Sequence, residues 1–250
     1  MTRTENSGVP AREGAAPSIT VFFPCYDEQA NVERVTQQAL TVLDALGADY
    51  EVIVVNDGSA DRTGPIADDL AARHARVRAI HHPVNRGYGA ALQSGFRAAT
   101  KDLVFYTDGD GQFDLNEMPP LLEVIRTCDI VSGYRLNRQD PLLRKVNGWC
   151  WTRLVCLVFG LKVRDIDCAF KLYRREIFES MPLCSTGALI DTEVLARAAR
   201  RGCTIKQVGV HHFPRTSGRQ TGANLRVILR AFRELWSLRR KILEQPAKDS

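Results

Sequence analysis

The feature that most restricts the fold is an alternation of short, continuously apolar runs with longer helical patterns in the first half of the chain. The apolar runs are SITVFFP (18–24), YEVIVVN (50–56), VRAIH (77–81) and LVFYT (103–107). Strands that are apolar on both sides are typical of a parallel sheet that helices cover on both faces. The sequence therefore predicts an α/β protein with a nucleotide-binding-type, mostly parallel sheet.

Polar motifs follow three of these four runs. PCYDE (24–28) follows the first, NDGS (56–59) the second and DGDGQ (108–112) the fourth. In parallel sheets of this kind the ligand binds beyond the carboxyl ends of the strands. The shared placement predicts one ligand site made from several loops.

The DGDGQ motif places Asp108, Asp110 and Gln112 at alternate positions, separated by glycines. In an extended segment such residues share one face, and three oxygen-bearing side chains suit a hard divalent cation. A polar turn is the alternative interpretation. Neither a G-x-G-x-x-G after the first strand nor a Walker A motif is present. We therefore expect a metal to neutralise the diphosphate of a nucleotide ligand.

The cysteine content and the apolar runs limit the compartment and the membrane topology that we expect. Seven cysteines in 250 residues, with no C-x-x-C spacing, indicate free thiols in a reducing compartment. Residues 1–17 contain no apolar core of a signal peptide, and we expect a disordered tail there and another over 244–250. No apolar run reaches the ~20 residues that would span a bilayer.

The net charge of +5 is concentrated in one segment, because residues 225–243 carry six cations and one anion. The remaining surface is close to neutral, so we expect no nucleic-acid partner. The pattern predicts a basic amphipathic helix over 223–243, and such a helix with Trp and Phe is typical of a membrane surface. Its apolar stripe is Leu225, Ile228, Leu229, Phe232, Leu235, Trp236 and Leu243. A helix packed on the catalytic sheet is the alternative, and residues 148–161 allow the same two interpretations.

Seven motifs in order resemble the inverting family 2 glycosyltransferases of GT-A fold, in particular the dolichol-phosphate mannose synthase-like branch. They are PCYDE (24–28), NDGSADRT (56–63), NRGYGAALQSGF (85–96), DGDGQ (108–112), VSGYR (131–135), RDIDCAFKLYRR (164–175) and HHFPRTSG (211–218). The resemblance runs from Ser18 to about Lys241. It implies a GT-A domain over 18–222, a GDP- or UDP-linked sugar donor, Mg²⁺ or Mn²⁺, and a polyprenyl-phosphate acceptor.

On the donor side, the resemblance implies that Pro24, Tyr26 and Glu28 line the nucleoside pocket and that Asp57 reads the base. Asp108, Asp110 and Gln112 would hold the metal on the donor diphosphate. The sequence departs from the family at Asp27, where Asn is usual, and at Asn56 and Arg62, which replace the commoner Asp and Gly.

On the phosphate side, Arg215 and Arg219 are positioned to close over phosphates with charge-assisted hydrogen bonds. Arg135 and Arg144 match the family's phosphate-contacting arginines, and RQTG after Gly218 replaces a Ser-Lys pair that is frequent in relatives. From the resemblance and from this chemistry we expect four catalytic residues, Asp110, Arg135, Arg144 and Arg215.

The acceptor decides whether a base is needed. A lipid phosphate is already anionic, whereas a sugar hydroxyl would need a carboxylate base, for which Asp191 or Glu193 in LIDTEV is the candidate. The helix first turn is the alternative role for both. We expect a peripheral enzyme on the cytoplasmic face of a membrane, with a membrane-protein partner possible. The rivals are a soluble enzyme with a hydroxyl acceptor and a catalytically silent nucleotide-sugar-binding subunit.

Several polar residues have a structural interpretation. Asp114 and Glu117 have the spacing of a capping box, and Asp61 is expected in a turn or cap. The paired histidines at 81–82 and 211–212 follow strands and are not expected to bind zinc. Asp165 and Asp167 are expected either to serve the site or to order the strand that follows them.

Overall fold

The computed structural model describes residues 16–136, 142–215 and 225–244, without the side chains of 142–144 and 225–232. The predicted tails, apart from positions 16–17 and 244, lie outside the described residues. So do Arg219 and the side chains of Arg144 and Phe232. All seven cysteines are free thiols.

Seven strands form one sheet in the order β3-β2-β1-β4-β6-β5-β7. Their bounds are β1 Ser18–Cys25, β2 Asp49–Asn56, β3 Val77–His81, β4 Leu103–Thr107, β5 Ile130–Leu136, β6 Phe170–Arg174 and β7 Ile205–His211. Only β6 runs antiparallel, against β4 and β5. The four predicted strands and the mostly parallel sheet are confirmed.

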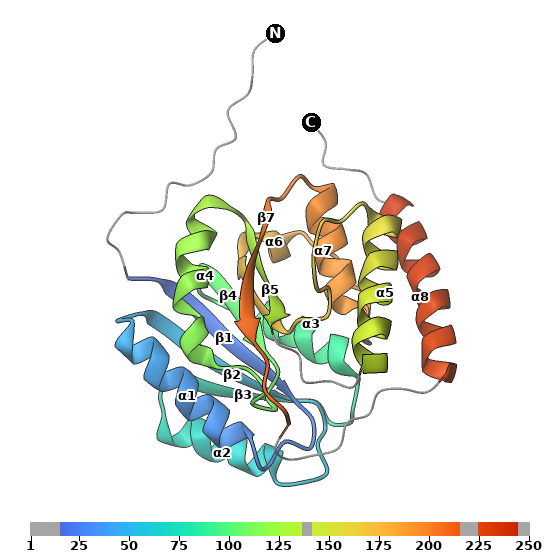
Figure 1. The fold of residues 1–250 in the computed structure, drawn as a ribbon. Helices are drawn as coiled ribbons and strands as arrows, with labels where there is room; N and C mark the ends of the chain where they lie inside the picture. The colour runs from blue at the N-terminus through green and yellow to red at the C-terminus, as the bar shows by residue number, and fades with distance from the viewer. Residues whose placement is uncertain (1–15, 137–141, 216–224, 245–250) are drawn as a thin grey trace.

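Helices surround the sheet (Figure 1). Their bounds are α1 Val32–Ala45, α2 Thr63–Arg73, α3 Tyr88–Ala98, α4 Pro119–Val124, α5 Leu142–Phe159, α6 Glu176–Glu179, α7 Ile190–Arg200 and α8 Leu225–Glu244, with short 3₁₀ helices at Leu115–Glu117 (η1) and Ile125–Thr127 (η2). Within these described helices, none is long and apolar enough to cross a membrane.

The strand order reverses direction at β1. From β1 the chain moves outward to β2 and then β3, and it returns past β1 to form β4. Right-handed crossovers therefore place α1 and α2 on one face of the sheet and α3 on the other. Sheets of this type bind ligands in a crevice at such a reversal. Here the loop after β4 lies against the loop after β1 and against α1, because the Gly109 amide donates to the Pro24 carbonyl at 3.4 Å and Gln38 of α1 donates to Asp114 at 2.8 Å.

Each central element follows from its sequence pattern. In β1 every residue from Ile19 to Cys25 is buried, as expected for a strand covered on both faces. In α1 the buried residues Val32, Val35, Ala39 and Leu43 recur at helical spacing and face the sheet. The core therefore lies on both sides of β1, β2 and β4.

The helix α8 lies side by side with α5 at one end of the molecule (Figure 1). Leu235, Leu238 and Ile242 are its buried residues, whereas Trp236 and Leu243 are exposed. The buried face is therefore rotated from the predicted stripe, which had included Trp236 and Leu243. The helix α8 packs mainly on α5 and α7.

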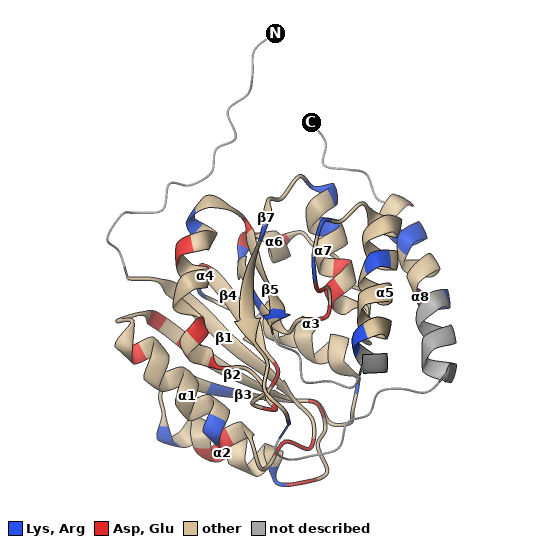
Figure 2. Ribbon diagram, viewed as in Figure 1, with Lys and Arg blue, Asp and Glu red and all other residues tan. Residues whose placement is uncertain are grey.

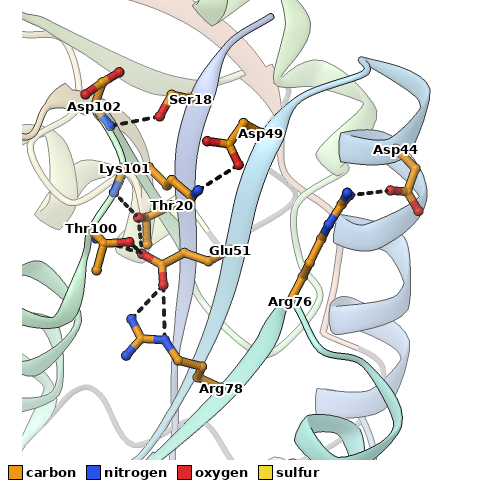
Figure 3. Close-up of polar contacts among 10 residues, drawn as sticks. All are labelled: Ser18, Thr20, Asp44, Asp49, Glu51, Arg76, Arg78, Thr100, Lys101 and Asp102. Carbon is orange, nitrogen blue, oxygen red and sulfur yellow. Dashed lines mark hydrogen bonds and ion pairs between the residues drawn. The ribbon is translucent and has the colours of Figure 1, made fainter.

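The amino ends of the central strands are joined by a buried carboxylate, Glu51 of β2 (Figure 3). One oxygen accepts hydrogen bonds from the Thr20 hydroxyl at 2.7 Å and from the Thr100 amide at 2.7 Å. The other oxygen accepts two bonds from Arg78, at 2.6 and 3.0 Å. Burial by itself raises the pKa of Glu51, but these donors outweigh it and hold the pKa below its ordinary value.

We expect Glu51→Gln to lower the free energy of unfolding by about 2–3 kcal/mol, because a buried carboxylate that accepts five hydrogen bonds loses its charge and part of its acceptor capacity. Since the folded pKa lies below the unfolded value of about 4.3, the stabilisation is present above that pH and is lost as the pH falls through the folded pKa. Urea unfolding at pH 7 and pH 3.5 measures both effects. Asp49→Asn, at the exposed ion pair with Lys101, is the control and should change stability by less than about 0.5 kcal/mol. An equal loss in both variants would contradict this role.

Candidate active site

The loops after β1 and β2 are fastened to one another. The Asp27 carboxylate accepts a hydrogen bond from the Ala60 amide at 2.9 Å, and the Asp27 amide donates to the Ser59 hydroxyl at 3.0 Å. Asp61 accepts bonds from the Gln29 amide at 3.1 Å and from its own turn, which confirms its predicted turn role. The two motifs therefore form one rigid wall of the crevice.

The predicted nucleoside-pocket residues lie on this wall. Pro24 is buried near the end of β1, and its carbonyl accepts a long bond of 3.4 Å from the Gly109 amide of the DGDGQ loop. Tyr26 is 47% exposed, so its ring is available to a ligand. Glu28 is buried and bonded to Asn31 at 2.8 Å. These residues border the same end of the sheet as the acidic loop.

Asp57 is more tightly bound to protein than the sequence indicated. It is buried, and its Oδ1 atom contacts His82 Nδ1 at 2.6 Å and accepts a hydrogen bond from the Arg86 amide at 2.9 Å. Its Oδ2 atom accepts a hydrogen bond from the Gly87 amide at 2.9 Å. A carboxylate has about four lone-pair sites, and three are used here. Asp57 thus holds the loop after β3 on β2, and base reading stays a prediction.

Asp108 and Asp110 lie together where β4 ends. Asp108 accepts a hydrogen bond from the Tyr88 hydroxyl at 2.9 Å. Burial, together with the charge of Asp110, raises the pKa of Asp108 to about 8. Burial also raises the pKa of Asp110, although Arg215 and Arg34 act against it. Two neighbouring carboxylates with raised pKa values, of which Asp110 is buried and Asp108 half-buried, form a site that favours an added positive charge.

Gly111 allows a cation to approach this loop. Its φ angle is +71°, and a Cβ atom at this position would lie 1.9 Å from Nη2 of Arg34. The guanidinium of Arg34, from α1, therefore rests against the backbone between the metal-ligand candidates. Sequence reasoning missed Arg34, because a single arginine in an amphipathic helix gives no local signal.

Arg215 brings together two predicted residues from distant segments. Its Nη2 atom forms an ion pair with Glu28, and its Nη1 atom lies 3.8 Å from Asp110 Oδ2. Arg215 is mostly buried, so the contact is poorly screened. The structure therefore places Arg215 at the acidic loop, where the sequence predicted a phosphate-binding arginine.

The segment before Arg215 is anchored to the DGDGQ loop. Gln112 donates from Nε2 to the Phe213 carbonyl at 2.8 Å, and its own carbonyl accepts from the Phe213 amide at 2.8 Å. Asp114 caps η1 through the Asn116 amide, as predicted, but Glu117 binds His211 and does not close a capping box. These contacts hold Arg215 beside Asp110.

Arg135 does not present a free cation to an acceptor. Its Nε and Nη2 atoms bind the two oxygens of Asp165 at 2.7 and 2.8 Å, and the pair is largely buried. Burial opposes the charge, but the Asp165 contacts raise the pKa of Arg135. Arg135 therefore has a carboxylate partner inside the protein, and its contact with an acceptor phosphate stays a prediction.

Asp191 and Glu193 lie in the first turn of α7 and both have protein partners. Glu193 is completely buried, accepts the Cys184 and Ser185 amides, and pairs with Arg197 at 2.7 Å. Burial raises its pKa, but the Ser185 and Cys184 contacts outweigh that effect and lower it. Glu193 therefore serves as a structural anion in these contacts, and a role as base stays a prediction. Asp191 is also buried, and it pairs with Lys171 at 2.7 Å.

A cavity of about 710 Å³ lies between the loop after β3, the loop before α7 and α8. Its walls are the loop 85–87, the loop 184–189, Trp151 of α5, Asp167 and one face of α8 that includes Lys241. Gly87 lines the cavity, and the next residue, Tyr88, contacts Asp108. The loop 184–189 is held by the Gly89 amide, which donates to the Thr186 carbonyl at 2.9 Å. The cavity is therefore preformed, and its α8 wall was not predicted.

Comparisons with known proteins agree with this geometry. The family model described as glycosyl transferase family 2 matches residues 20–181. Glycosyltransferase AglD of Haloferax volcanii is 33% identical over 225 residues, which is 86% of this chain and 36% of AglD. The chain thus spans about a third of the length of that curated relative.

Solved structures of glucosyl-3-phosphoglycerate synthase from Mycobacterium tuberculosis share the fold. The complex with Mn²⁺, uridine-diphosphate-glucose and phosphoglyceric acid has a TM-score of 0.67 at 20% identity, over 93% of this chain and 82% of that one. The complex with uridine diphosphate has a TM-score of 0.65 at 20% identity, over the same shares of the two chains. At this identity the likeness describes the architecture.

We expect Asp57→Asn to lower the free energy of unfolding by about 2 kcal/mol, because an amide oxygen cannot accept all three hydrogen bonds. If Asp57 only read the base, nucleotide affinity would fall while the melting temperature stayed unchanged. Differential scanning calorimetry and nucleotide titration on the same variant separate the two roles. Asp68→Asn, at the exposed contact with His81, is the control and should melt like the parent protein.

Proposed function

From the premise that the chain belongs to glycosyl transferase family 2, we propose that it transfers a hexose from a nucleotide-sugar to a polyprenyl phosphate. The chain is a nucleotide-sugar glycosyltransferase with a GT-A fold. We assign it to the dolichol-phosphate mannose synthase-like branch, with mannose or glucose as the sugar and GDP or UDP as the carrier. The observation that carries the proposal is the acidic pair Asp108 and Asp110 beside Arg215 at the reversal of the sheet.

The donor set fits Mg²⁺ or Mn²⁺ that arrives with the nucleotide. Within the described residues, no group of three or more His, Cys, Asp or Glu side chains could hold a metal by itself. Mg²⁺ is usually bound by one or two carboxylates together with substrate phosphates, and not by a cage made only of protein ligands. Asp108 and Asp110 supply two carboxylates, and Gln112 is tied to Phe213 through its amide nitrogen. We infer that the diphosphate completes the coordination.

The residues then have distinct tasks in an inverting transfer. The metal supplies Lewis-acid stabilisation of the leaving diphosphate. Arg215 lies beside Asp110 and Arg34 lies against Gly111, and both would add charge-assisted hydrogen bonds to the diphosphate oxygens. The acceptor oxygen attacks the anomeric carbon from the opposite face, and the bond from that carbon to the diphosphate breaks.

A phosphate acceptor agrees with the absence of an accessible carboxylate at positions 191 and 193. The second pKa of a phosphate monoester is about 6, so at neutral pH it is a ready nucleophile that has no proton to transfer. We propose that it enters the 710 Å³ cavity, where Arg86 and Lys241 take the acceptor role first expected of Arg135. The apolar wall that includes Leu238 would receive the first part of the lipid chain.

We also propose that α5 and α8 bind the cytoplasmic face of a membrane. Leu157 and Trp149 of α5 are 83% and 59% exposed, and Trp236 of α8 is 57% exposed. Cations lie on both helices (Figure 2), and among them Arg153 packs over the Trp149 ring. Exposed aromatic and aliphatic side chains interspersed with cations are typical of an interfacial surface.

One observation favours the alternative function, in which a soluble enzyme uses a hydroxyl acceptor. The similar synthase was solved with phosphoglyceric acid, so a small phosphorylated acceptor is the second candidate. Such an acceptor would also use cations in the cavity, but it would require a base for its hydroxyl and no membrane.

Turnover and nucleotide binding should require Mg²⁺ or Mn²⁺. Asp110→Asn should weaken both by at least about 100-fold, because losing a residue that binds the metal directly costs more affinity than losing a residue that only hydrogen-bonds to such a ligand. Isothermal titration with UDP and GDP, with and without Mn²⁺, measures the binding. Asp114→Asn keeps the cap on η1 and serves as the matched control, expected within about twofold of the parent. Full activity in excess chelator would refute the metal assignment.

Labelled sugar from UDP-glucose or GDP-mannose should appear on undecaprenyl phosphate and not on undecaprenol, because only the phosphate can act without a base. Lys241→Met should raise the acceptor KM about 10-fold, the cost of one charged hydrogen bond. Arg240→Met is the matched control on the outer face of α8. Transfer to phosphoglyceric acid, with none to the lipid phosphate, would favour the soluble rival.

Binding to vesicles of anionic lipid should fall for Trp149→Ala/Trp236→Ala, with an unchanged melting temperature because both rings are exposed. Binding of the parent should weaken as salt rises, since the cations are screened. Val84→Ala, at an exposed apolar residue of the loop after β3, is the control. Unchanged sedimentation of the double variant would exclude this surface.

A further inference from the structure

We propose that Asp167 and Trp151 form the subsite for the hexose of the donor, and that Asp167 determines which sugars are accepted. In this proposal the Asp167 carboxylate accepts hydrogen bonds from sugar hydroxyls, while the Trp151 ring provides an apolar surface for the C–H groups of the sugar. The proposal rests on the nucleotide-sugar transfer proposed above and deepens it, because that function left both residues of the cavity wall without a task.

The register of the sheet places Asp167 at the same end as the DGDGQ loop. β6 runs antiparallel to β4, and Phe170 at the start of β6 pairs with Thr107 at the end of β4. Neighbouring strands lie about 4.8 Å apart. Asp167 comes three residues before Phe170, and Asp110 comes three residues after Thr107. The segment that carries Asp167 therefore enters the sheet at the edge where the DGDGQ loop leaves it.

The strand order gives the two ends of the donor separate places. β4 lies between β1 and β6 in the sheet. The predicted nucleoside residues Tyr26 and Glu28 follow β1, whereas Asp167 precedes β6, so they flank the DGDGQ loop from opposite sides. In a nucleotide-sugar the diphosphate joins the nucleoside to the sugar. A donor that binds its diphosphate at Asp110 and its base on the β1 side therefore extends its hexose toward the β6 side.

The backbone around Asp167 is fixed by its neighbours. The ammonium of Lys171 donates to the carbonyls of Ile166 at 3.2 Å and Cys168 at 2.5 Å. These two carbonyls flank Asp167, and Lys171 is completely buried. The Ile166 amide donates to the Thr152 hydroxyl at 3.4 Å, which ties this segment to α5. The position of Asp167 is therefore set before a ligand binds, as a selective site requires.

The carboxylate of Asp167 has unused acceptor sites. Within the described part of the chain, no amide, hydroxyl or cation donates a hydrogen bond to it, whereas both oxygens of Asp165 bind Arg135. Asp167 lines the 710 Å³ cavity and is accessible there. Burial by the surrounding protein, together with the charges of Asp191 and Asp165, raises the pKa of Asp167 to about 6. An accessible anion in such a concave site suits a ligand that donates hydrogen bonds.

Among the groups that the transfer brings together, the hexose suits this wall best. The diphosphate and an acceptor phosphate are anions, so an ionised carboxylate repels them, and a lipid chain has no hydrogen-bond donors. A hexose has several hydroxyl donors. Trp151 lines the same cavity and is next in sequence to Thr152, which holds the Ile166 amide. Neighbouring segments therefore supply a carboxylate and an aromatic ring, a combination typical of small-molecule sites.

The test compares the full donor with donors that lack one hydroxyl. Equilibrium binding in Mn²⁺ is measured for UDP-glucose or GDP-mannose, whichever the parent binds, and for its 2-, 3-, 4- and 6-deoxy analogues. At least one analogue should bind the parent about 10- to 100-fold more weakly, the effect of one hydrogen bond to a charged group. In Asp167→Ala this difference should shrink to about twofold. Asp167→Asn keeps one acceptor oxygen and should retain part of it.

Two further variants separate the parts of the subsite. Glu234→Gln is the matched control, because Glu234 is a carboxylate that lines the same cavity from α8, and it should keep the discrimination of the parent. Trp151→Ala should weaken binding of the full donor about 3- to 10-fold and leave the affinity for free UDP or GDP unchanged. Circular dichroism melts of each variant verify that the fold is intact.

Parent-like discrimination in folded Asp167→Ala would overturn the proposal, and so would an equal change in Glu234→Gln. A parent that binds all the deoxy analogues as well as the full donor would also overturn it. Unchanged donor affinity in Trp151→Ala would remove Trp151 from the subsite. A loss of turnover of about 10²–10⁴-fold in Asp167→Asn, with the discrimination intact, would instead make Asp167 a base for a hydroxyl acceptor.

The readout is binding of the donor, so it does not depend on the acceptor. A parent that binds the donor and discriminates through Asp167, but transfers nothing to a lipid phosphate, would refute the proposed acceptor and support the subsite. A parent that binds no nucleotide-sugar would refute the function and this proposal with it. Failure of the subsite is therefore distinguishable from failure of the proposed function.

Discussion

The parallel pairing of β1 with both β2 and β4 is the constraint on which the rest of the structure depends. Because the chain reverses its direction across the sheet at this strand, the carboxyl ends of β1 and β4 lie next to each other, and sheets of this type bind ligands there. Glu28 follows β1 and Asp110 follows β4, and Arg215 contacts both. A different strand order would separate these three side chains, whatever their identities.

The chemistry of the site follows from an excess of buried negative charge. Burial raises the pKa of Glu28, Asp108 and Asp110, and the nearby cations Arg34 and Arg215 offset this only in part. A dicationic metal with a diphosphate is the kind of ligand that relieves such an arrangement, because the metal binds the carboxylates and the arginines bind the phosphates. The acidic segments are visible in the loops at this end of the sheet (Figure 2).

The other half of the molecule contains the cavity that α8 helps to line, and it is there that we propose the acceptor binds. The helix contributes Leu235, Leu238 and Ile242 to the packing and turns Lys241 toward the cavity, while Trp236 faces outward. One helix thus contacts the catalytic body, the cavity and the solvent with three different faces. This arrangement would bring a membrane-bound acceptor to the site without a further domain in the described part of the chain.

The sequence by itself determined the first four strands, the mostly parallel sheet and the loops that carry the candidate site, because buried strands and the polar turns after them leave a local pattern. It also identified Asp108, Asp110 and Arg215, whose residue types and motif context point to a metal and phosphates. Only the tertiary structure decided the partners of the charged groups. Arg215 pairs with Glu28 across 187 positions, Arg135 is bound by Asp165, and Lys171 lies beneath Asp191. The physical reason is that an ion pair depends on distance in space, and residue type does not reveal whether a ligand or another side chain will satisfy the charge. For the same reason an amphipathic pattern predicted α8 but not which of its faces would be covered.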